Sequence, residues 1–312
     1  MQNLIQSNNE DEGYHIPVLL QECIGALNIQ PDGTYVDCTF GGGGHSAAIL
    51  DQLSAKGKLY VFDQDQDAKV NAPADERLHF IPQNFRHLHK FLRLYNALPV
   101  DGILADLGIS SHQIDVPERG FSTRYDAPLD MRMDQSQKRT AADLLNTYTE
   151  VQLHKMFEKY GSVTNAKSLA AFIVETRRAN PFSGINAFKQ TIYNYVKGNP
   201  HKYLAQVFQA LRMEVNEEEI VLKELLMQTT NCLVTGGRLA IITFHSVEDR
   251  LVKNFMRSGT TGDQSNQEDD LYGRKLESPF MMLHKKPIIA TEAEQKINPR
   301  SRSAKLRVAE KK

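Results

Sequence analysis

The chain has 312 residues, of which 41% are hydrophobic and 24% charged, and its formal net charge is −1. This is ordinary globular composition, and the length suffices for two domains or for one domain with an insertion. Because the charges nearly cancel, the molecule is not a polycation, so any binding of nucleic acid must use local basic patches.

The cysteines and the N-terminal segment indicate the kind of environment. Cys23, Cys38 and Cys232 lie far apart and form no C-x-x-C pair, which argues against a disulfide scaffold or a structural zinc site. No other cluster of ligating residues is evident, so we expect no metal. Residues 1–14 are polar, are expected to be disordered, and lack the features of a signal peptide. With no apolar run of roughly 18 residues, we expect a cytoplasmic protein without membrane association.

The first third of the chain alternates predicted strands with predicted helices. A helix is expected over 16–27. Short apolar runs then predict strands at 34–37, 59–62, 80–81 and 101–106, with helices at 46–53, 66–72 and 86–95. Such alternation is typical of a parallel α/β sheet.

The alternation stops after Asp106. Residues 113–139 are expected to form a loop, and helical periodicity follows at 140–147, 149–159, 164–179, 185–197 and 207–226. A strand returns at 237–244, followed by a helix at 247–256, a polar loop at 259–275 and a last strand at 304–308. The simplest architecture is a doubly wound α/β domain of residues 15–115 and 207–312, interrupted by a helical insertion at 116–206.

Four glycines, Gly41 to Gly44, connect the first strand to a helix. Glycines let a loop turn tightly and let a ligand approach the backbone at a helix N-terminus. Asp63 ends the next strand, 22 positions after Gly41, where an acid can accept hydrogen bonds from ribose hydroxyls. This arrangement predicts a nucleotide cofactor, although a glycine turn without a ligand is the alternative.

Asp37 favours S-adenosylmethionine over a dinucleotide. Gly42 and Gly44 with Ala47 also fit the spacing of an NAD-binding loop. An acid at the end of the first strand can contact the ammonium of the methionine moiety, whereas a pyrophosphate gains nothing from that charge. We expect His45 to contact the cofactor rather than a metal, since no partner lies at ligand spacing.

Eight segments resemble the bacterial 16S rRNA (cytosine-N4)-methyltransferase family, also called MraW. They are HIPVLL at 15–20, DCTFGGGGHS at 37–46, DLGISS at 106–111, ERGFS at 118–122, PLDMRMD at 128–134, FQALRMEVN at 208–216, GGRLAIITFHS at 236–246 and NPRSRSAKLR at 298–307. They occur in the family's order. The resemblance implies a class I, Rossmann-like S-adenosylmethionine methyltransferase fold whose helical insertion recognises the substrate.

The resemblance also implies a reaction and a cofactor site. The reaction is methylation of N4 of the cytosine conventionally numbered 1402 in 16S rRNA of the small ribosomal subunit. The family's cofactor positions fall here on Gly43, Gly44, His45, Asp63, Phe85, Asp106 and Gln113. The chain departs from the family pattern in having His112 where proline is common, Ser162-Val163 where two glutamates are common, and a divergent stretch around 186–203.

Asp106 is the candidate catalytic residue. It ends the fourth predicted strand, at the edge where α/β sheets present their sites. Acceptors aimed at the hydrogens of the cytosine amine turn its lone pair outward and stabilise the developing positive charge. We expect Asp106 and the backbone of 107–111 to supply them, with cofactor binding alone as the alternative. Methylation at carbon 5 would need a thiolate nucleophile, and none of the cysteines lies in a suitable loop.

Substrate RNA is expected to contact loops near this edge. A target base must leave its stack, and Phe121, Tyr125 and Phe244 are candidates to hold it, with core packing as the alternative. Phosphates and bases are expected at Arg119, Arg124, Arg132, His245, Arg300, Arg302 and Lys305. Some of these residues could have structural roles instead of contacting RNA. Arg132 can pair with Asp130 or Asp134, and the helix after His245 can be capped by His245 or by Ser246 with Asp249.

Three other functions compete with this interpretation. The glycine spacing alone supports an NAD-dependent dehydrogenase. A non-catalytic RNA-binding protein could keep the same fold. A methyltransferase could also act on a protein or a small molecule, and only the resemblance argues against that.

Overall fold

The computed structural model describes residues 16–261 and 277–312. The expected disorder of residues 1–14, motif residue His15 and most of the predicted loop at 259–275 lie outside the described residues. None of the helices within 16–261 and 277–312 is long and apolar enough to cross a membrane.

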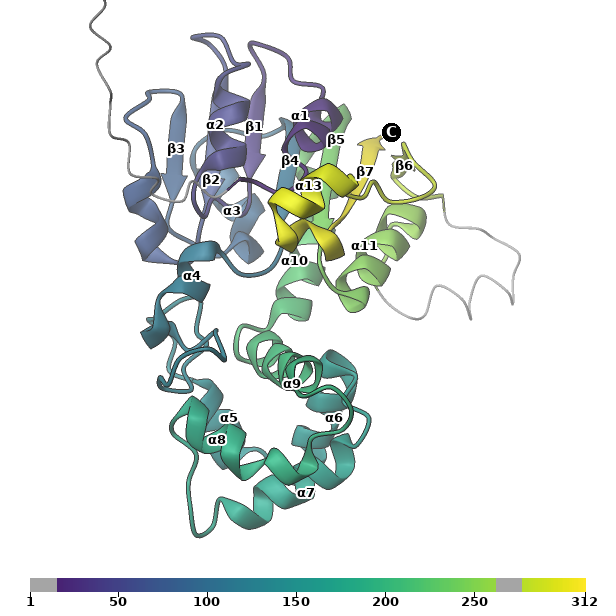
Figure 1. Cartoon of the computed structure of the whole chain (residues 1–312). Helices are drawn as coiled ribbons and strands as arrows, with labels where there is room; N and C mark the ends of the chain where they lie inside the picture. The colour runs from purple at the N-terminus through teal and green to yellow at the C-terminus, as the bar shows by residue number, and fades with distance from the viewer. Residues whose placement is uncertain (1–15, 262–276) are drawn as a thin grey trace, which may run out of the picture.

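The larger part of the structure is a seven-stranded sheet in the order β3-β2-β1-β4-β5-β7-β6 (Figure 1). Its strands are β1 Thr34–Asp37, β2 Lys58–Phe62, β3 Leu78–Ile81, β4 Val100–Asp106, β5 Leu233–Thr243, β6 Phe280–Met282 and β7 Lys305–Lys311. Strands β1 to β5 are parallel, whereas β7 runs antiparallel to both β5 and β6. The expected doubly wound α/β sheet is confirmed.

Helices cover both faces of the sheet, so alternate strand residues enter two different cores. Tyr60 and Phe62 of β2 pack in the core that faces α3, α10 and α11, while Leu59 and Val61 pack in the core beneath α1 and α2. Burial on both faces explains why the strands are nearly continuous apolar runs. The helices are α1 Leu20–Leu27, α2 Gly44–Leu50, α3 Leu88–Leu94, α10 Glu218–Cys232 and α11 Ser246–Ser258, with α13 Glu292–Ile297 near the C-terminus.

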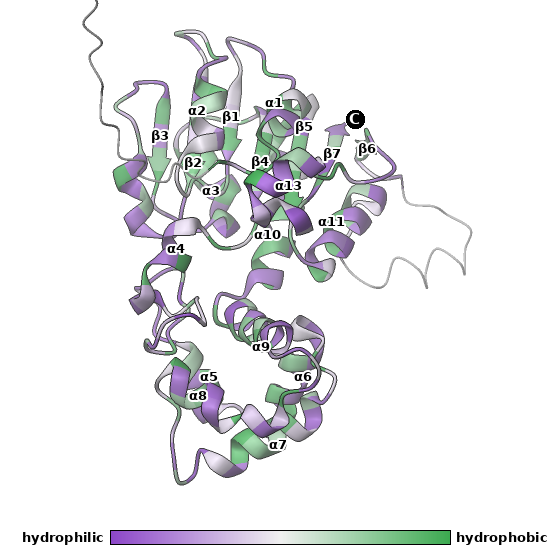
Figure 2. Cartoon of the chain, in the orientation of Figure 1, coloured by the Kyte–Doolittle hydropathy of each residue, from purple (hydrophilic) through white to green (hydrophobic). Residues whose placement is uncertain are grey.

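A helical insertion with its own core lies beyond the carboxyl edge of the sheet (Figure 1). Its helices are α5 Ala141–Thr147, α6 Glu150–Gly161, α7 Ala166–Thr176, α8 Ile185–Thr191 and α9 Pro200–Val215, and the short helix α4 Ser111–Asp115 precedes it. Hydrophilic and hydrophobic residues alternate along them (Figure 2), as expected for helices with one buried face. The buried residues of this core run from Leu129 to Val215. The helical insertion predicted from the sequence is therefore present.

The prediction of one helix over 207–226 is wrong. Two helices, α9 and α10, meet at Asn216 and Glu217, where Glu217 takes a left-handed conformation with φ of 52°. The buried Asn216 amide fixes this break. It accepts from Met133 N (2.7 Å) and donates to the carbonyls of Met131 and Arg212 (2.8 Å each).

Two smaller corrections concern the ends of predicted elements. The first helix begins at Leu20 rather than at residue 16, because Leu19 has a left-handed φ of 53°. Helix α4 overlaps the start of the expected loop 113–139. Ser110 and Gln113 build a capping box at the start of this helix, and the box was not predicted because it begins before residue 113.

We predict that Asn216→Ala destabilises the protein by about 2 to 4 kcal/mol, because it leaves a buried N–H and a buried carbonyl without partners. Urea denaturation followed by circular dichroism measures the change. Asn194→Ala, at an exposed position of the same insertion, serves as the control. Equal midpoints for the two variants would show that the amide does not stabilise the break.

Candidate functional site

Three aspartates meet where adjacent strands end. Asp37 ends β1, Asp106 ends β4, and Asp63 directly follows β2. Since β2, β1 and β4 are parallel neighbours in the sheet, their carboxyl ends share one edge, which faces the helical insertion (Figure 1). This is the edge at which α/β sheets bind ligands.

Asp37 is buried and fixes the loops around it. Its Oδ1 accepts from the backbone N–H of Thr39 (3.0 Å), and its Oδ2 accepts from the Ser46 hydroxyl (2.7 Å). The Thr39 hydroxyl in turn accepts from the Asp106 N–H (2.7 Å), which ties β1 to β4. Sequence analysis missed Thr39 and Ser46, although both lie inside the DCTFGGGGHS segment.

Asp63 holds the glycine loop in place. Its carboxylate accepts from the N–H groups of Gly41 (2.7 Å) and Asp65 (2.8 Å). Gly41 and Gly43 have φ of 51° and 78°, which side chains other than glycine rarely adopt. A Cβ atom added at Gly42 would meet nothing within 4 Å. The loop therefore presents open backbone beside a carboxylate with lone pairs to spare.

Asp106 has one oxygen without a partner. Its Oδ1 is buried and accepts no hydrogen bond in the described residues, while its Oδ2 lies 3.9 Å from His45 Nδ1. The other ring nitrogen, Nε2, donates to the Val18 carbonyl at 3.0 Å. An unpaired buried acceptor is costly, so this oxygen is suited to a donor supplied by a ligand.

Burial, and to a smaller degree neighbouring carboxylates, raise the pKa of two aspartates at this edge, Asp106 and Asp63. Burial raises the pKa of Asp106 to about 6; His45 opposes this shift and Asp37 adds to it. Burial also raises the pKa of Asp63 to about 6, although backbone hydrogen bonds oppose the shift, and Asp65 and Asp37 add to it. A cationic ligand would relieve this accumulation of negative charge, whereas a pyrophosphate would be repelled.

These features fit S-adenosylmethionine, which carries a sulfonium and an ammonium group. Asp63 would accept from its ribose hydroxyls, the loop of Gly43 and Gly44 would pass beneath it, and Asp37 and Asp106 would face its positive charges. His45 adjoins this set through Asp106. The dinucleotide alternative gains no support from the same carboxylates.

Gln113 and Phe85 border the same edge. The Gln113 amide donates to Asp65 Oδ2 (2.8 Å), and its oxygen accepts from Ser110 N (3.2 Å). Gln113 thus ties α4 to the loop after β2. Phe85 begins the 3₁₀ turn Phe85–His87 after β3 and is partly buried against the sheet core.

Two of the arginines expected to contact RNA form internal ion pairs instead. Arg119 is buried, and its guanidinium binds Asp65 (2.8 Å) and Asp67 (3.0 Å) and donates to the carbonyls of Arg132 and Met133. Arg132 makes a two-pronged pair with Asp130 (2.8 and 2.7 Å). Because their donors are engaged within the protein, we no longer assign these two residues to phosphate.

The other cations lie nearer to solvent. Arg124 and Arg302 are exposed, and Arg300 is half-buried and donates to the Ser111 hydroxyl. Lys305 lies 3.5 Å from Asp249, so part of its charge is neutralised.

His245 precedes α11 at the end of β5. The capping pair of this helix is His245 with Glu248, not Ser246 with Asp249, because Glu248 accepts from the N–H groups of Phe244 (2.9 Å) and His245 (3.2 Å). Asp249 instead binds Arg307 (2.6 Å). Burial and the nearby Arg212 lower the pKa of His245 to about 3, so its ring is neutral at pH 7.

The three aromatic residues proposed to hold the target base lie in different surroundings. Phe121 packs against the core of the insertion, whereas Tyr125 is exposed. Phe244 lies beside the loop after β4, since a Cβ atom at Gly108 would be 3.6 Å from its ring.

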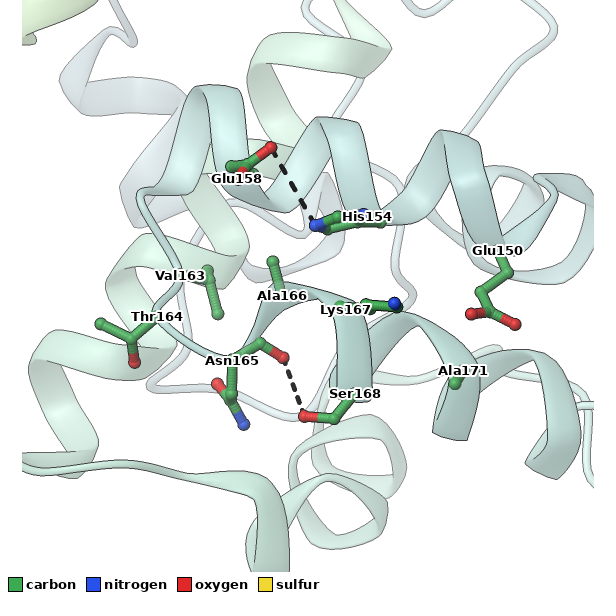
Figure 3. Close-up of a pocket in the computed structure, with 10 residues that line it drawn as sticks. All are labelled: Glu150, His154, Glu158, Val163, Thr164, Asn165, Ala166, Lys167, Ser168 and Ala171. Carbon is green, nitrogen blue, oxygen red and sulfur yellow. Dashed lines mark hydrogen bonds and ion pairs between the residues drawn. The ribbon is translucent and has the colours of Figure 1, made fainter.

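The cavity in Figure 3 lies elsewhere, between α6 and α7 of the insertion. Glu150, His154 and Lys167 are among its lining residues, and His154 Nε2 lies 4.0 Å from a Glu158 oxygen. No group of three or more His, Cys, Asp or Glu side chains in residues 16–261 and 277–312 is arranged to hold a metal ion. The cavity shares no residue with the carboxylate edge.

Comparisons with protein families and with known proteins point to the same family. The model of the MraW methylase family matches residues 12–312. Proteins named ribosomal RNA small subunit methyltransferase H are similar along nearly the whole chain. The relative from Bacteroides fragilis is 50% identical over 304 residues, covering 97% of this chain and 99% of its own. That from Cytophaga hutchinsonii is 52% identical over 301 residues, covering 96% and 99%.

We predict that Asp106→Asn stabilises the ligand-free protein at pH 7.5 by about 1 to 2 kcal/mol. Because the folded-state pKa of Asp106 is raised to about 6, wild-type stability falls as pH rises from about 4 through 6. The asparagine variant has no carboxyl group to ionise, so the difference in unfolding free energy between it and the wild type grows over the same pH interval. Urea denaturation at pH 4.5 and 7.5 measures it, with the exposed Asp51→Asn as control. An advantage independent of pH would contradict the assignment.

Proposed function

The chain belongs to the MraW methylase family, and from this premise we propose that it methylates N4 of a cytosine in 16S rRNA. The position proposed is the cytosine conventionally numbered 1402, in the small ribosomal subunit. The relatives' names, which specify small-subunit ribosomal RNA, support the substrate class. Because the proposed substrate is ribosomal RNA, we also propose that the reaction takes place in the cytoplasm.

The observation that carries the proposal is the unpaired Oδ1 of Asp106 at an edge lined with carboxylates. S-adenosylmethionine, when bound, supplies a methyl group already activated by its sulfonium, so the protein mainly has to align the amine. The proposed cofactor-binding residues are Asp37, Gly43, Gly44, His45, Asp63, Phe85, Asp106 and Gln113.

Asp106 is the proposed catalytic residue. The cytosine amine is a poor nucleophile because the ring shares its lone pair. A hydrogen bond from the amine to Asp106 Oδ1 would hold the amine in place and stabilise the positive charge that develops on its nitrogen. Since burial raises the pKa of this carboxyl to about 6, it is ionised at pH 7 and basic enough to accept the released proton.

Methylation at carbon 5 is disfavoured by the cysteines. That chemistry needs a thiolate that attacks the base. Cys23, Cys38 and Cys232 are all buried, and burial raises the pKa of each thiol. A buried thiol with a raised pKa is neither ionised nor accessible at pH 7.

RNA contacts are proposed at the exposed cations and at the end of β5. Arg124, Arg300 and Arg302 would bind phosphates. Lys305 would contribute less, because Asp249 neutralises part of its charge. His245 follows the strand next to that of Asp106, and its neutral ring can take part in hydrogen bonds with a base. Phe244 and Tyr125 are the remaining candidates for stacking.

We predict that the purified protein transfers label from radioactive S-adenosylmethionine to small ribosomal subunits that lack the modification. Nucleoside analysis should place the label in N4-methylcytidine. The rate should rise between pH 5 and 7 as Asp106 ionises. Asp106→Asn should lower kcat at least a hundredfold, while the Kd for S-adenosylmethionine changes less.

The alternatives give different outcomes in the same assay. Label in 5-methylcytidine would contradict the proposed reaction. If Asp106→Asn kept its turnover, the residue would have no catalytic part. Binding of NAD in place of S-adenosylmethionine would favour a dehydrogenase.

A further inference from the structure

Asp65 is a buried carboxylate beside the cofactor site, and the proposed function gives it no role. It is 5% exposed and follows Asp63 by two residues. Its backbone N–H donates to Asp63 Oδ1 (2.8 Å), and its Oδ2 accepts from the Gln113 amide (2.8 Å). Asp65 therefore contacts two of the proposed cofactor-binding residues, one through its backbone and the other through its side chain.

The two residues that Asp65 contacts belong to different parts of the sheet. Asp63 directly follows β2, whereas Gln113 lies in α4, which comes after β4. In the sheet, β1 lies between β2 and β4. A hydrogen bond from Asp65 to Gln113 therefore spans the carboxyl end of β1, where Asp37 lies. This bond links the two sides of the site.

The side chain of Gln113 is held from both ends of its amide. Its oxygen accepts from the Ser110 N–H (3.2 Å), and its NH₂ group donates to Asp65 Oδ2 (2.8 Å). Gln113 is 4% exposed. Because Ser110 presents a donor to the oxygen, the amide cannot turn over without losing that hydrogen bond. The residue at position 65 must therefore offer an acceptor to Gln113.

Arg119 supplies the counter-charge for Asp65. Its Nη2 lies 2.8 Å from Asp65 Oδ2, and its Nη1 lies 3.0 Å from Asp67 Oδ2. The same guanidinium donates to the carbonyls of Arg132 (3.1 Å) and Met133 (3.0 Å). A buried carboxylate is costly unless it is paired and hydrogen-bonded. Arg119 therefore offsets the cost of burying Asp65 and fixes its carboxylate from the side of the insertion.

We propose that Asp65, paired with Arg119, is a positioning residue that sets Asp63 and Gln113 for the nucleoside part of the cofactor. The inference rests on the proposed function, which assigns Asp63 and Gln113 to S-adenosylmethionine. The side-chain contacts of Asp65 fix the loop after β2, and its fixed backbone N–H orients the carboxylate of Asp63. A binding site weakens when the groups that support its ligand-binding side chains are loosened.

Asp65→Asn in the full-length protein tests this role. The Asp65 carboxylate accepts on both oxygens, from the Asp67 N–H (3.2 Å) on Oδ1 and from Gln113 and Arg119 on Oδ2. Asparagine has one acceptor oxygen, so one of these positions would bring an NH₂ group against a donor. The variant should still fold, because Arg119 keeps Asp67 and two backbone carbonyls as partners.

Asp67→Asn is the matched control. It removes a carboxylate from the same loop and from the same arginine, since Asp67 Oδ2 pairs with Arg119 (3.0 Å) and His112 (3.4 Å). Its side chain is about half exposed. The control therefore reproduces the loss of charge beside Arg119 while it leaves Asp65 in place to hold Gln113.

Calorimetric titration measures the affinity for S-adenosylmethionine at pH 7.5, where Asp63, with a pKa of about 6, is ionised. Asp65→Asn should raise the Kd about ten- to hundredfold, and Asp67→Asn less than about threefold. At saturating cofactor the kcat of Asp65→Asn should stay within about threefold of the wild type, because Asp106 is untouched and the loss appears in KM.

A pair of nucleosides distinguishes positioning from general loosening of the structure. Adenosine can donate its ribose hydroxyls to Asp63, whereas 2′,3′-dideoxyadenosine has none to donate. The wild type should bind adenosine about tenfold more tightly. In Asp65→Asn this ratio should fall towards one, because Asp63 no longer faces the hydroxyls. If both nucleosides lost affinity by the same factor, Asp65 would be merely structural and the inference would be overturned.

Arg119→Lys provides a second variant. Lysine keeps the charge but lacks the planar fork that reaches Asp65 and Asp67 together, so it should reduce the preference for adenosine less strongly. Combined with Asp65→Asn it should add little, because both changes act on one ion pair. Thermal denaturation shows which variants are folded. If Asp65→Asn is unfolded, an unchanged preference for adenosine in folded Arg119→Lys overturns the inference.

The outcomes separate this inference from the proposed function. If the wild type forms N4-methylcytidine and Asp65→Asn binds S-adenosylmethionine as tightly as Asp67→Asn does, the positioning role is wrong and the function stands. If Asp65→Asn loses cofactor affinity and the preference for adenosine, but the wild type does not methylate the rRNA, the positioning role is supported and the proposed reaction is wrong.

Discussion

The accumulation of buried carboxylates at one edge of the sheet is the constraint on which the site depends. Asp37, Asp63 and Asp106 are brought together because β2, β1 and β4 are parallel neighbours whose carboxyl ends share one edge of the sheet. An aspartate at the end of each of these strands therefore adds negative charge to the same edge. The protein offsets part of it with N–H groups of Gly41, Thr39 and Asp65. The rest remains for a cationic ligand, and Asp106 Oδ1 is the oxygen that the described residues leave unpaired.

Buried polar side chains join the insertion to this edge. Arg119 binds Asp65 and Asp67 of the loop after β2 and also the backbone at Arg132 and Met133. Asn216 receives the N–H of the same Met133 and sets the break between α9 and α10. Each group would be costly to leave without its partner. The loop 116–139 is therefore tied through Arg119 to the turn after β2 and through Asn216 to the junction of α9 and α10.

Sequence patterns predicted the sheet well because its signals are local. Apolar runs that end in Asp37 and Asp106, and glycines that require positive φ, depend on a few adjacent residues. The pairing of Arg132 with Asp130, two residues away, was among the predicted alternatives, but the role of Arg119 could not be predicted in this way. An arginine in a polar loop has the same local sequence whether it faces phosphate or an aspartate 50 residues away. The break at Asn216 was missed for a related reason, since the amide acts through Met131 and Met133, about 85 positions earlier.

The arrangement of charge shows why a nearly neutral chain can serve two ligands of opposite sign. Residues 116–206 contain 13 Lys or Arg and 8 Asp or Glu, while the net charge of the whole chain is −1. The insertion is therefore cationic, whereas residues 16–115, 207–261 and 277–312 together contain 22 Lys or Arg and 23 Asp or Glu and are nearly neutral. A positive cofactor is attracted to the carboxylates of the sheet, and a polyanion is attracted to the insertion. Since the insertion lies beyond the carboxyl edge of the sheet, its positive charge adjoins the carboxylates of Asp37, Asp63 and Asp106, so that groups suited to an anion and groups suited to a cation lie on neighbouring parts of the molecule.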